Sequence, residues 1–193
     1  AGVYEPAHDR EYYAIRNSAA LIDVSPLFKY ELRGPDALRA ANRIVTRDVA
    51  RMSTGQVIYT PWCDDDGKVL DDGTLARLSE QRFRFAAAED NYAWFQDCCF
   101  GLQAQVLDVT TDFAALAVQG PSSRDLLQRV LSSVDLAALR YYRLAEARLD
   151  DRPVLISRTG YTGDLGYELW LAPEHAGALW DRLVDEGRAF GAL

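Results

Sequence analysis

The residues best suited to chemistry lie in one glycine-rich segment, residues 157–168, which reads SRTGYTGDLGYE. Its three glycines alternate with tyrosines, an arginine and two carboxylates. Glycine allows positive φ angles and a close approach of the backbone to its neighbours, so the spacing predicts a tight loop of defined shape. Because this loop presents aromatic rings and a carboxylate, it suits a flat heteroaromatic ligand with hydrogen-bonding edges. A glycine-rich turn that binds no ligand is the alternative interpretation.

Two adjacent carboxylates, Asp71 and Asp72, lie inside a segment that otherwise predicts a strand. Carboxylates are disfavoured in the middle of a strand. The pair therefore indicates either a functional role or a turn or bulge that faces water beside Gly73. Successive side chains of a strand point to opposite faces, so the two aspartates are not expected to act as a paired acid and base. We expect one of them to face a ligand.

The sequence offers little support for metal or nucleotide chemistry. The acidic turn at residues 64–67 (DDDG) lacks the D-x-D-x-D-G spacing of a calcium loop. The two histidines, His8 and His175, are far apart, which argues against a histidine metal site or a catalytic triad. The glycine loop lacks the spacing of a P-loop or of the dinucleotide-binding GxGxxG motif. We therefore expect neither a metal nor a nucleotide.

Composition excludes several classes of partner. The formal net charge of −8 argues against nucleic acid and anionic membrane surfaces, because both are bound by clustered lysine and arginine. No apolar run approaches the roughly 20 residues of a membrane span, and residues 1–16 lack the pattern of a signal peptide. Cys63, Cys98 and Cys99 cannot all pair within one chain, which favours reduced thiols and a cytoplasmic protein. The oligomeric state stays open.

Hydrophobic periodicity and turn residues predict an α+β fold. Helices are expected at residues 8–19, 36–44, 89–100, 121–131 and 173–187, and strands at 27–33, 56–63, 68–78, 82–88, 103–109, 114–118, 139–149, 154–157 and 167–171. We expect an interruption of the strand 68–78 at residues 71–73. The last helix should face inward with Ala176, Leu179, Trp180 and Leu183. Frequent hairpins favour antiparallel or mixed sheets over a doubly wound parallel sheet.

The glycine-rich segment resembles the RTGYTGE-x-GYE signature of the aminomethyltransferase family, which comprises the glycine-cleavage T-protein and its relatives. Four further segments resemble motifs of this family in the same order. They are residues 11–25 (EY…ALIDVS), 55–59 (GQVIY), 67–72 (GKVLDD) and 118–121 (VQGP). Together the five motifs span nearly the whole sequence.

This resemblance implies a fold of two interlocked ferredoxin-like units that enclose a tetrahydrofolate site. It implies that Asp72 is the essential carboxylate beside the folate nitrogens that accept the one-carbon unit, where it either stabilises positive charge or transfers a proton. It implies that Glu168 accepts the two donors of the pterin edge. Tyr161 and Tyr59 match tyrosines that line the folate pocket, although plain core tyrosines remain the alternative. Arg158 is expected to bond loop carbonyls.

Residues 1–193 are accordingly expected to be an aminomethyltransferase-type folate-binding domain, truncated and without the family's C-terminal barrel. The implied function is tetrahydrofolate-dependent one-carbon transfer in one-carbon metabolism. The donor would be an aminomethyl group on a lipoyl carrier protein, as in the glycine cleavage system, or a methylated small molecule. The DDGT-x-x-RL sequence after Leu70 resembles the demethylase branch of the family, and Asp164 replaces the usual glutamate of the loop.

Two other functions are compatible with the same resemblance. One is a folate-binding module without transferase activity, of the type that serves iron–sulfur protein maturation. Those relatives typically lack the complete hairpin carboxylate motif, so the presence of Asp72 argues against it. The other is a folate-using domain fused to a flavin dehydrogenase, for which this sequence contains no flavin-binding segment.

Overall fold

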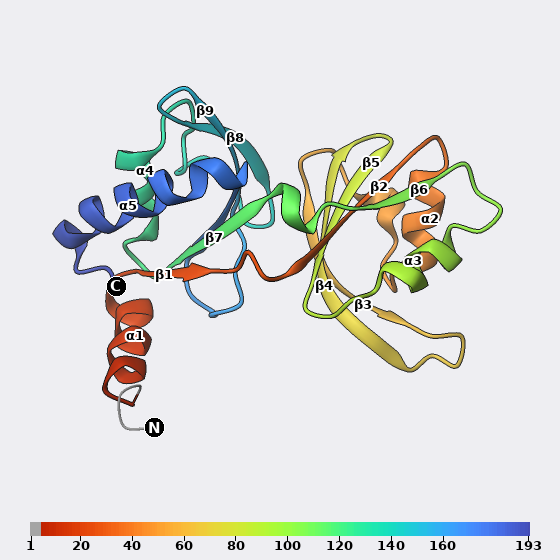
Figure 1. Cartoon of the computed structure of the whole chain (residues 1–193), viewed down its shortest axis with the longest axis horizontal. Helices are drawn as coiled ribbons and strands as arrows, with labels where there is room; N and C mark the ends of the chain where they lie inside the picture. Colours follow the sequence, from red (N-terminus) through yellow and green to blue (C-terminus); the bar gives the residue numbers. More distant parts are fainter. Residues whose placement is uncertain (1–4) are drawn as a thin grey trace. The chain divides into compact units, whose positions relative to one another are not determined.

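The computed structural model describes residues 5–193, which form two compact units. The first unit combines the chain up to Ser25 with Asp112–Leu193, and the second unit is Pro26–Thr111. Each unit contains a five-stranded antiparallel sheet and its own hydrophobic core (Figure 1). The fold is therefore α+β, as expected, and the sheets are antiparallel and not mixed.

In the second unit the sheet has the strand order β3-β4-β5-β2-β6. Its elements are β2 (Phe28–Arg33), α2 (Ala37–Ile44), the 3-10 helix η1 (Val49–Arg51), β3 (Val57–Cys63), β4 (Val69–Ser79), β5 (Arg82–Ala87), α3 (Tyr92–Cys98) and β6 (Gln105–Asp108). A further 3-10 helix, η2 (Thr110–Asp112), follows. Helices α2 and α3 pack on one face of the sheet, so the other face is left to carry polar side chains.

In the first unit the strand order is β1-β7-β10-β9-β8. Its elements are α1 (Glu5–Asn17), β1 (Ala20–Asp23), β7 (Ala114–Gln119), α4 (Ser123–Val130), β8 (Leu144–Leu149), β9 (Arg152–Ser157), β10 (Gly166–Leu171), η3 (Pro173–His175), α5 (Ala176–Gly187) and η4 (Arg188–Phe190). Helices α4 and α5 contribute Leu126, Leu127, Leu179 and Leu183 to the core on one face of this sheet. Site residues can therefore occupy the opposite face.

The two sheets are built in the same way. In the second unit, β2-α2-β4-β5-α3-β6 is a ferredoxin-like βαββαβ arrangement with the spatial order β4-β5-β2-β6, and β3 is added beside β4. In the first unit, β9-β10-β7-β1 repeats this order, and β8 is added beside β9. The position of β6 is taken by β1, which precedes the whole second unit in sequence. This interlocking confirms the expected duplicated ferredoxin-like units.

The cores of the two units differ in kind. Trp62, Phe85 and Phe95 form the centre of the second core, with the rings of Phe85 and Phe95 4.7 Å apart. The first core is mostly aliphatic, and Tyr167 is its only tyrosine among the described residues. Burial of this apolar surface supplies the main driving force for folding, at about 25 cal/mol per Å².

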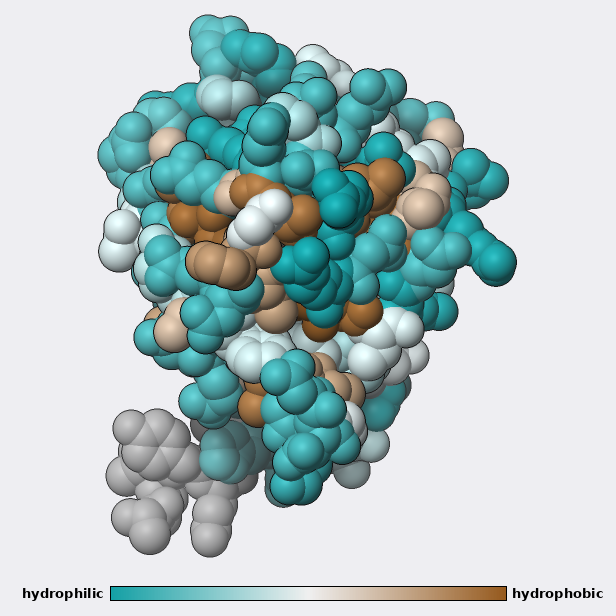
Figure 2. Space-filling view, turned by 90° about the vertical axis from the view of Figure 1, so that its right-hand side faces the viewer, coloured by the Kyte–Doolittle hydropathy of each residue, from teal (hydrophilic) through white to brown (hydrophobic). Residues whose placement is uncertain are grey.

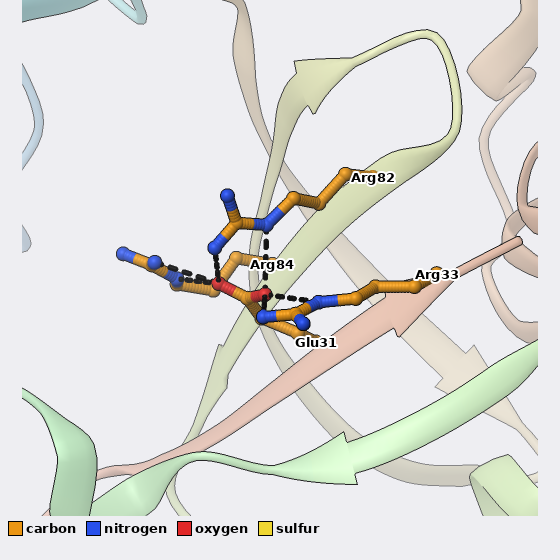
Figure 3. A network of polar contacts seen from close by, with 4 residues as sticks. All are labelled: Glu31, Arg33, Arg82 and Arg84. Atoms are coloured by element: carbon orange, nitrogen blue, oxygen red, sulfur yellow. Dashed lines mark hydrogen bonds and ion pairs between the residues drawn. The ribbon is translucent and has the colours of Figure 1, made fainter.

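A buried ion cluster joins β2 to β5 in the second unit (Figure 3). Glu31 is 0% exposed and accepts hydrogen bonds from the guanidinium groups of Arg33, Arg82 and Arg84 at 2.5–3.1 Å. Burial alone would raise the pKa of Glu31, but the three arginines outweigh it and lower the pKa to about 2. Arg33 and Arg82 face each other across the strands, where like charges repel. The carboxylate between them offsets part of that repulsion.

Several predicted elements needed correction. Strand β4 continues through residues 71–73 without the expected interruption, because Asp71 finds partners inside the unit. The last helix is divided, since Pro173 opens a 3-10 turn before α5. Trp180 does not face inward: it lies at the edge of the apolar stripe and is 37% exposed. Strand β1 was not predicted.

Hydrophilic residues cover most of the face shown in Figure 2, with smaller hydrophobic patches between them. Within residues 5–193, each helix is too short or too polar to cross a membrane.

Candidate functional site

The hairpin of β3 and β4 places Tyr59 beside Asp72. Pro61 lies opposite Asp72 in the register, so Tyr59 is the diagonal neighbour of Asp72 on the same face. The Tyr59 hydroxyl donates a hydrogen bond of 2.7 Å to Oδ2 of Asp72. This bond to a carboxylate raises the pKa of Tyr59, because ionised tyrosine would lose it. Asp72 is exposed and Tyr59 is 47% exposed, so both can reach a ligand.

The side chain of Asp71 points to the opposite, core-facing side of β4, where it accepts hydrogen bonds from neighbouring groups. Its Oδ2 accepts hydrogen bonds from the amide nitrogen of Glu89 at 3.1 Å and from Nδ2 of Asn91 at 2.8 Å. Oδ1 of Asn91 in turn accepts the indole Nε1–H of Trp62 at 2.9 Å. Asp71 therefore anchors the strand to the segment before α3, whereas Asp72 stays on the exposed face of the hairpin.

Gly73 is required by close packing between β4 and β5. A Cβ atom at this position would overlap the carbonyl oxygen of Ala86 and would lie 3.1 Å from the Trp62 ring. The glycine after the aspartate pair therefore lets the strands approach while Asp72 stays on the exposed face.

On β10 of the first unit, Glu168 lies on the sheet face opposite the core, next to two hydroxyl groups. Oγ1 of Thr159 donates a 2.7 Å hydrogen bond to Oε2 of Glu168, and Oγ of Ser157 lies 2.7 Å from Oγ1 of Thr159. Burial raises the pKa of Glu168, and the Thr159 hydrogen bond offsets this only in part. A partly buried carboxylate with a single side-chain donor has acceptor positions left for a ligand N–H group.

The glycine loop between β9 and β10 forms a hollow of about 360 Å³ lined by Tyr141, Arg158, Thr159, Gly160, Gly163, Asp164, Leu165 and Gly166. Tyr161 belongs to this loop and is 71% exposed, so it is not a core tyrosine. As expected, Nη1 of Arg158 bonds a carbonyl, that of Leu139, at 3.1 Å. Asp164 forms an ion pair with Arg16, which ties the loop to α1.

The structure therefore groups the predicted residues unit by unit. Tyr59 and Asp72 are in direct contact in the second unit. Glu168 and Tyr161 belong to the first unit, where Glu168 contacts Thr159. Sequence reasoning missed Thr159 as a partner of Glu168, and it treated Gln119 only as part of a motif. A glutamine that ends the apolar run AALAVQ was the available signal for the latter.

Comparison with known proteins agrees with this architecture. Residues 2–193 match the GCVT N-terminal domain. The chain belongs to this family. It is 39% identical over 187 residues to the aminomethyltransferase of Halothermothrix orenii, covering 95% of this chain and 52% of the relative. It is 38% identical over 191 residues to the trimethylamine-oxide aldolase of Ruegeria pomeroyi, covering 94% of this chain and 24% of that protein.

A solved member of the family has the same fold. The crystal structure of glycine cleavage system aminomethyltransferase T from Bartonella henselae superposes with a TM-score of 0.84 at 28% identity, covering 95% of this chain and 49% of that chain. The chain thus spans about half the length of these aminomethyltransferases, and a quarter of the aldolase.

Proposed function

We propose that this chain is the folate-binding domain of a tetrahydrofolate-dependent one-carbon transferase. The observation that carries the proposal is a pair of carboxylates on equivalent scaffolds in opposite settings. Glu168 is partly buried beside one hydroxyl donor, whereas Asp72 is exposed beside a tyrosine. Carboxylates whose environments differ in this way suit different tasks in one reaction. The domain would be part of a longer enzyme in the bacterial cytoplasm, where its cysteines, all free in the structure, stay reduced.

Glu168 is the group that would hold the pterin edge. A pterin presents a ring N–H and an exocyclic amine side by side, and one carboxylate can accept both. Thr159 occupies one acceptor position of Oε2, and each carboxylate oxygen has two. The residues present therefore fit the ligand. Binding of two donors would favour the ionised form and counteract the burial that raises the pKa of Glu168.

Asp72 is the group that would act at the reacting nitrogen. Tetrahydrofolate, when bound, would supply the nitrogen that accepts the one-carbon unit. The Asp72 carboxylate would stabilise positive charge on that nitrogen or accept its proton. Tyr59 holds Oδ2 through its hydroxyl, so Oδ1 would be the oxygen that meets the ligand. The exposed ring of Tyr59 would contact the ligand near Asp72, and the exposed ring of Tyr161 would contact it near the glycine loop.

The donor has two candidates. An aminomethyl group on a lipoyl carrier protein is supported by the names of several relatives, which are aminomethyltransferases of 34–40% identity. A methylated small molecule, in a demethylase reaction, is supported by the DDGT sequence of β4 and by the relative named trimethylamine-oxide aldolase. A non-catalytic module of the iron–sulfur maturation type is the weaker alternative, because the hairpin retains Asp72 in an exposed position.

Calorimetric titration with tetrahydrofolate tests the binding half of the proposal. Glu168→Gln should weaken binding roughly 10- to 100-fold, since a hydrogen bond to a charged group contributes about 1.5–3 kcal/mol. Glu146→Gln is the matched control, because Glu146 is an exposed carboxylate on β8 of the same sheet. Equal weakening by both variants, or no binding by any of the proteins, would contradict the folate site.

The transfer half needs a labelled donor. Asp72→Asn should abolish movement of a ¹³C-labelled one-carbon unit to tetrahydrofolate while binding changes by less than about tenfold. Testing an aminomethyl-lipoyl carrier and methylated amines in parallel would distinguish the donor classes. Full activity of Asp72→Asn with either donor would eliminate its proposed role.

A further inference from the structure

Gln119 is a fully buried polar residue at the end of β7, on the same sheet face as Glu168. It is 0% exposed. In the register, Gln119 lies opposite Gly166 and Ala117 lies opposite Glu168. Positions two residues apart on a strand share a face, so the amide of Gln119 and the carboxylate of Glu168 lie on one side of the sheet. A buried amide needs hydrogen-bond partners, and those partners are all in the glycine loop and its flank.

The Gln119 amide bonds the loop at three separated points. Nε2 donates to the carbonyl of Thr159 at 3.2 Å and to the carbonyl of Tyr167 at 3.3 Å. Oε1 accepts the hydroxyl hydrogen of Thr162 at 3.0 Å. The first two attachments lie on Thr159, whose hydroxyl bonds Glu168, and on the residue immediately before Glu168. The amide therefore holds both sides of the Thr159–Glu168 hydrogen bond.

Two loop glycines make room for this amide. A Cβ atom on Gly160 or on Gly166 would overlap Oε1 of Gln119, and neither glycine has a positive φ that would itself require glycine. Gly163 is different: its φ is +81° and a Cβ atom there would meet open space. Gly160 and Gly166 thus leave the space that the Gln119 amide fills, whereas Gly163 is needed for its backbone conformation.

We propose that Gln119 is a positioning residue of the Glu168 site, whose side-chain amide shapes the glycine loop so that Thr159 orients the carboxylate for its ligand. This proposal depends on the proposed function in one respect, because it takes Glu168 to be the group that binds the ligand. A carboxamide is required because it combines two donors with an acceptor. A carboxylate of the same shape would face two carbonyl oxygens without a hydrogen to share.

The test is made without ligand, so that it does not depend on folate binding. In Gln119→Glu and in Gln119→Met, the hydrogen bond from Thr159 to Glu168 should weaken. The pKa of Glu168, followed by NMR of ¹³C-labelled glutamate, should rise further, because the Thr159 hydrogen bond that lowers it is weakened. Amide hydrogen exchange at residues 159–167 should quicken at least about tenfold. Gln119→Met serves if the buried charge of Gln119→Glu prevents folding.

A double-mutant cycle supplies an independent test. In the native background, Gly166→Ala should change both the amide hydrogen exchange of the loop and the titration of Glu168. Much of this change should disappear in the Gln119→Ala background, because the overlapping amide is absent there. Gly163→Ala is the control, whose effect should be the same in both backgrounds. If Gln119 variants lower thermal stability but leave the Glu168 titration and the loop exchange unchanged, the residue is only structural and the proposal is overturned.

A parallel titration with tetrahydrofolate separates the two ideas. Weaker binding by Gln119→Met together with a shifted Glu168 titration would support both. A shifted titration in a protein that never binds folate would leave the positioning of Glu168 supported and contradict the proposed function.

Discussion

The two units share a strand order but differ in which connection between strands is long. In the second unit, β4 and β5 are joined by a tight turn at Glu80 and Gln81, and the longer connection lies between β3 and β4. In the first unit, β8 and β9 are joined by a tight turn at Asp150 and Asp151, and the long glycine loop joins β9 to β10. The two units therefore share one sheet architecture but present different connections at its edge.

The two units also differ in the surroundings of their carboxylates. In the second unit Glu31 is neutralised by three arginines, and Asp72 is exposed to solvent with one tyrosine partner. In the first unit Glu168 has one hydroxyl donor and is only partly exposed. The pKa of a glutamate is therefore shifted in opposite directions in the two units, since that of Glu31 is lowered and that of Glu168 is raised. Partners, not residue type, set the charge state.

The largest effect is expected at Glu31. Glu31→Gln leaves three arginines without their anion and should lower the free energy of unfolding by about 3 kcal/mol. The folded-state pKa of about 2 lies below the usual 4.5. The stabilisation is therefore complete above pH 4.5 and is lost as the pH falls towards 2. Urea unfolding at about pH 7 and about pH 3 measures both effects.

The control for this prediction is Asp66→Asn, which removes an exposed ion pair with Lys68 and should change the free energy of unfolding little. Equal losses of stability in the two variants would contradict the expected difference.

The next effect is expected at Gly73. Gly73→Ala forces the new methyl group against the Ala86 carbonyl and should cost about 2 kcal/mol through overpacking. Gly67→Ala is the matched variant, since Gly67 has a φ of +80° and open space around it. Its cost, of about 1 kcal/mol, comes from backbone strain alone. Thermal unfolding of both proteins checks the order, and a reversed order would show that β4 and β5 can separate without penalty.

Glu168→Gln should have a smaller effect, with the opposite sign to Glu31→Gln. The pKa of Glu168 is raised in the folded state from the ordinary value of 4.5. The folded protein therefore binds the proton more tightly than the unfolded chain does, and stability falls as the pH rises above 4.5. The glutamine variant lacks this loss, so it should be more stable than the native protein at about pH 7, by about 1 kcal/mol or less, and nearly equal to it at about pH 4. A destabilised variant at neutral pH would reverse our view of this site.

The smallest effect concerns Tyr59. Removing the carboxylate in Asp72→Asn should return the raised pKa of Tyr59 towards its ordinary value, because the negative charge disappears and a neutral amide oxygen accepts the tyrosine hydrogen more weakly. Stability should change by less than about 1 kcal/mol, since the pair is exposed. Ultraviolet titration of tyrosine ionisation, with Tyr59→Phe to assign the signal, measures the shift. An unchanged titration would mean that Tyr59 and Asp72 are not paired in solution.

Much of the fold was predictable because its signals are local. Alternation in residues 27–33 and 82–88 predicted β2 and β5, and the glycines of residues 157–168 predicted the loop. The edge of the first sheet was not predictable in the same way. β1 pairs with β7 through Ala20 and Gln119, which lie on opposite sides of the whole second unit in sequence. Periodicity carries no information about so distant a pairing.

The same distinction between local and distant signals applies to the candidate site. Sequence and resemblance were enough to single out Asp72, Tyr59, Glu168 and Tyr161. They did not decide between Asp71 and Asp72 on physical grounds, because that choice depends on Glu89 and Asn91, which reach Asp71 from the segment before α3. They also did not reveal Gln119, because its partners come from the loop after β9.

By itself, then, the sequence determined which segments become strands, where the chain can turn, and which side chains are available for chemistry, since these depend on near neighbours. The tertiary structure alone decided which carboxylate is surrounded by arginines, which is partly buried beside a hydroxyl group and which is exposed. Desolvation and hydrogen bonding depend on residues brought together from distant parts of the chain, as Arg82 and Arg84 are brought to Glu31 and as Thr159 is held beside Glu168.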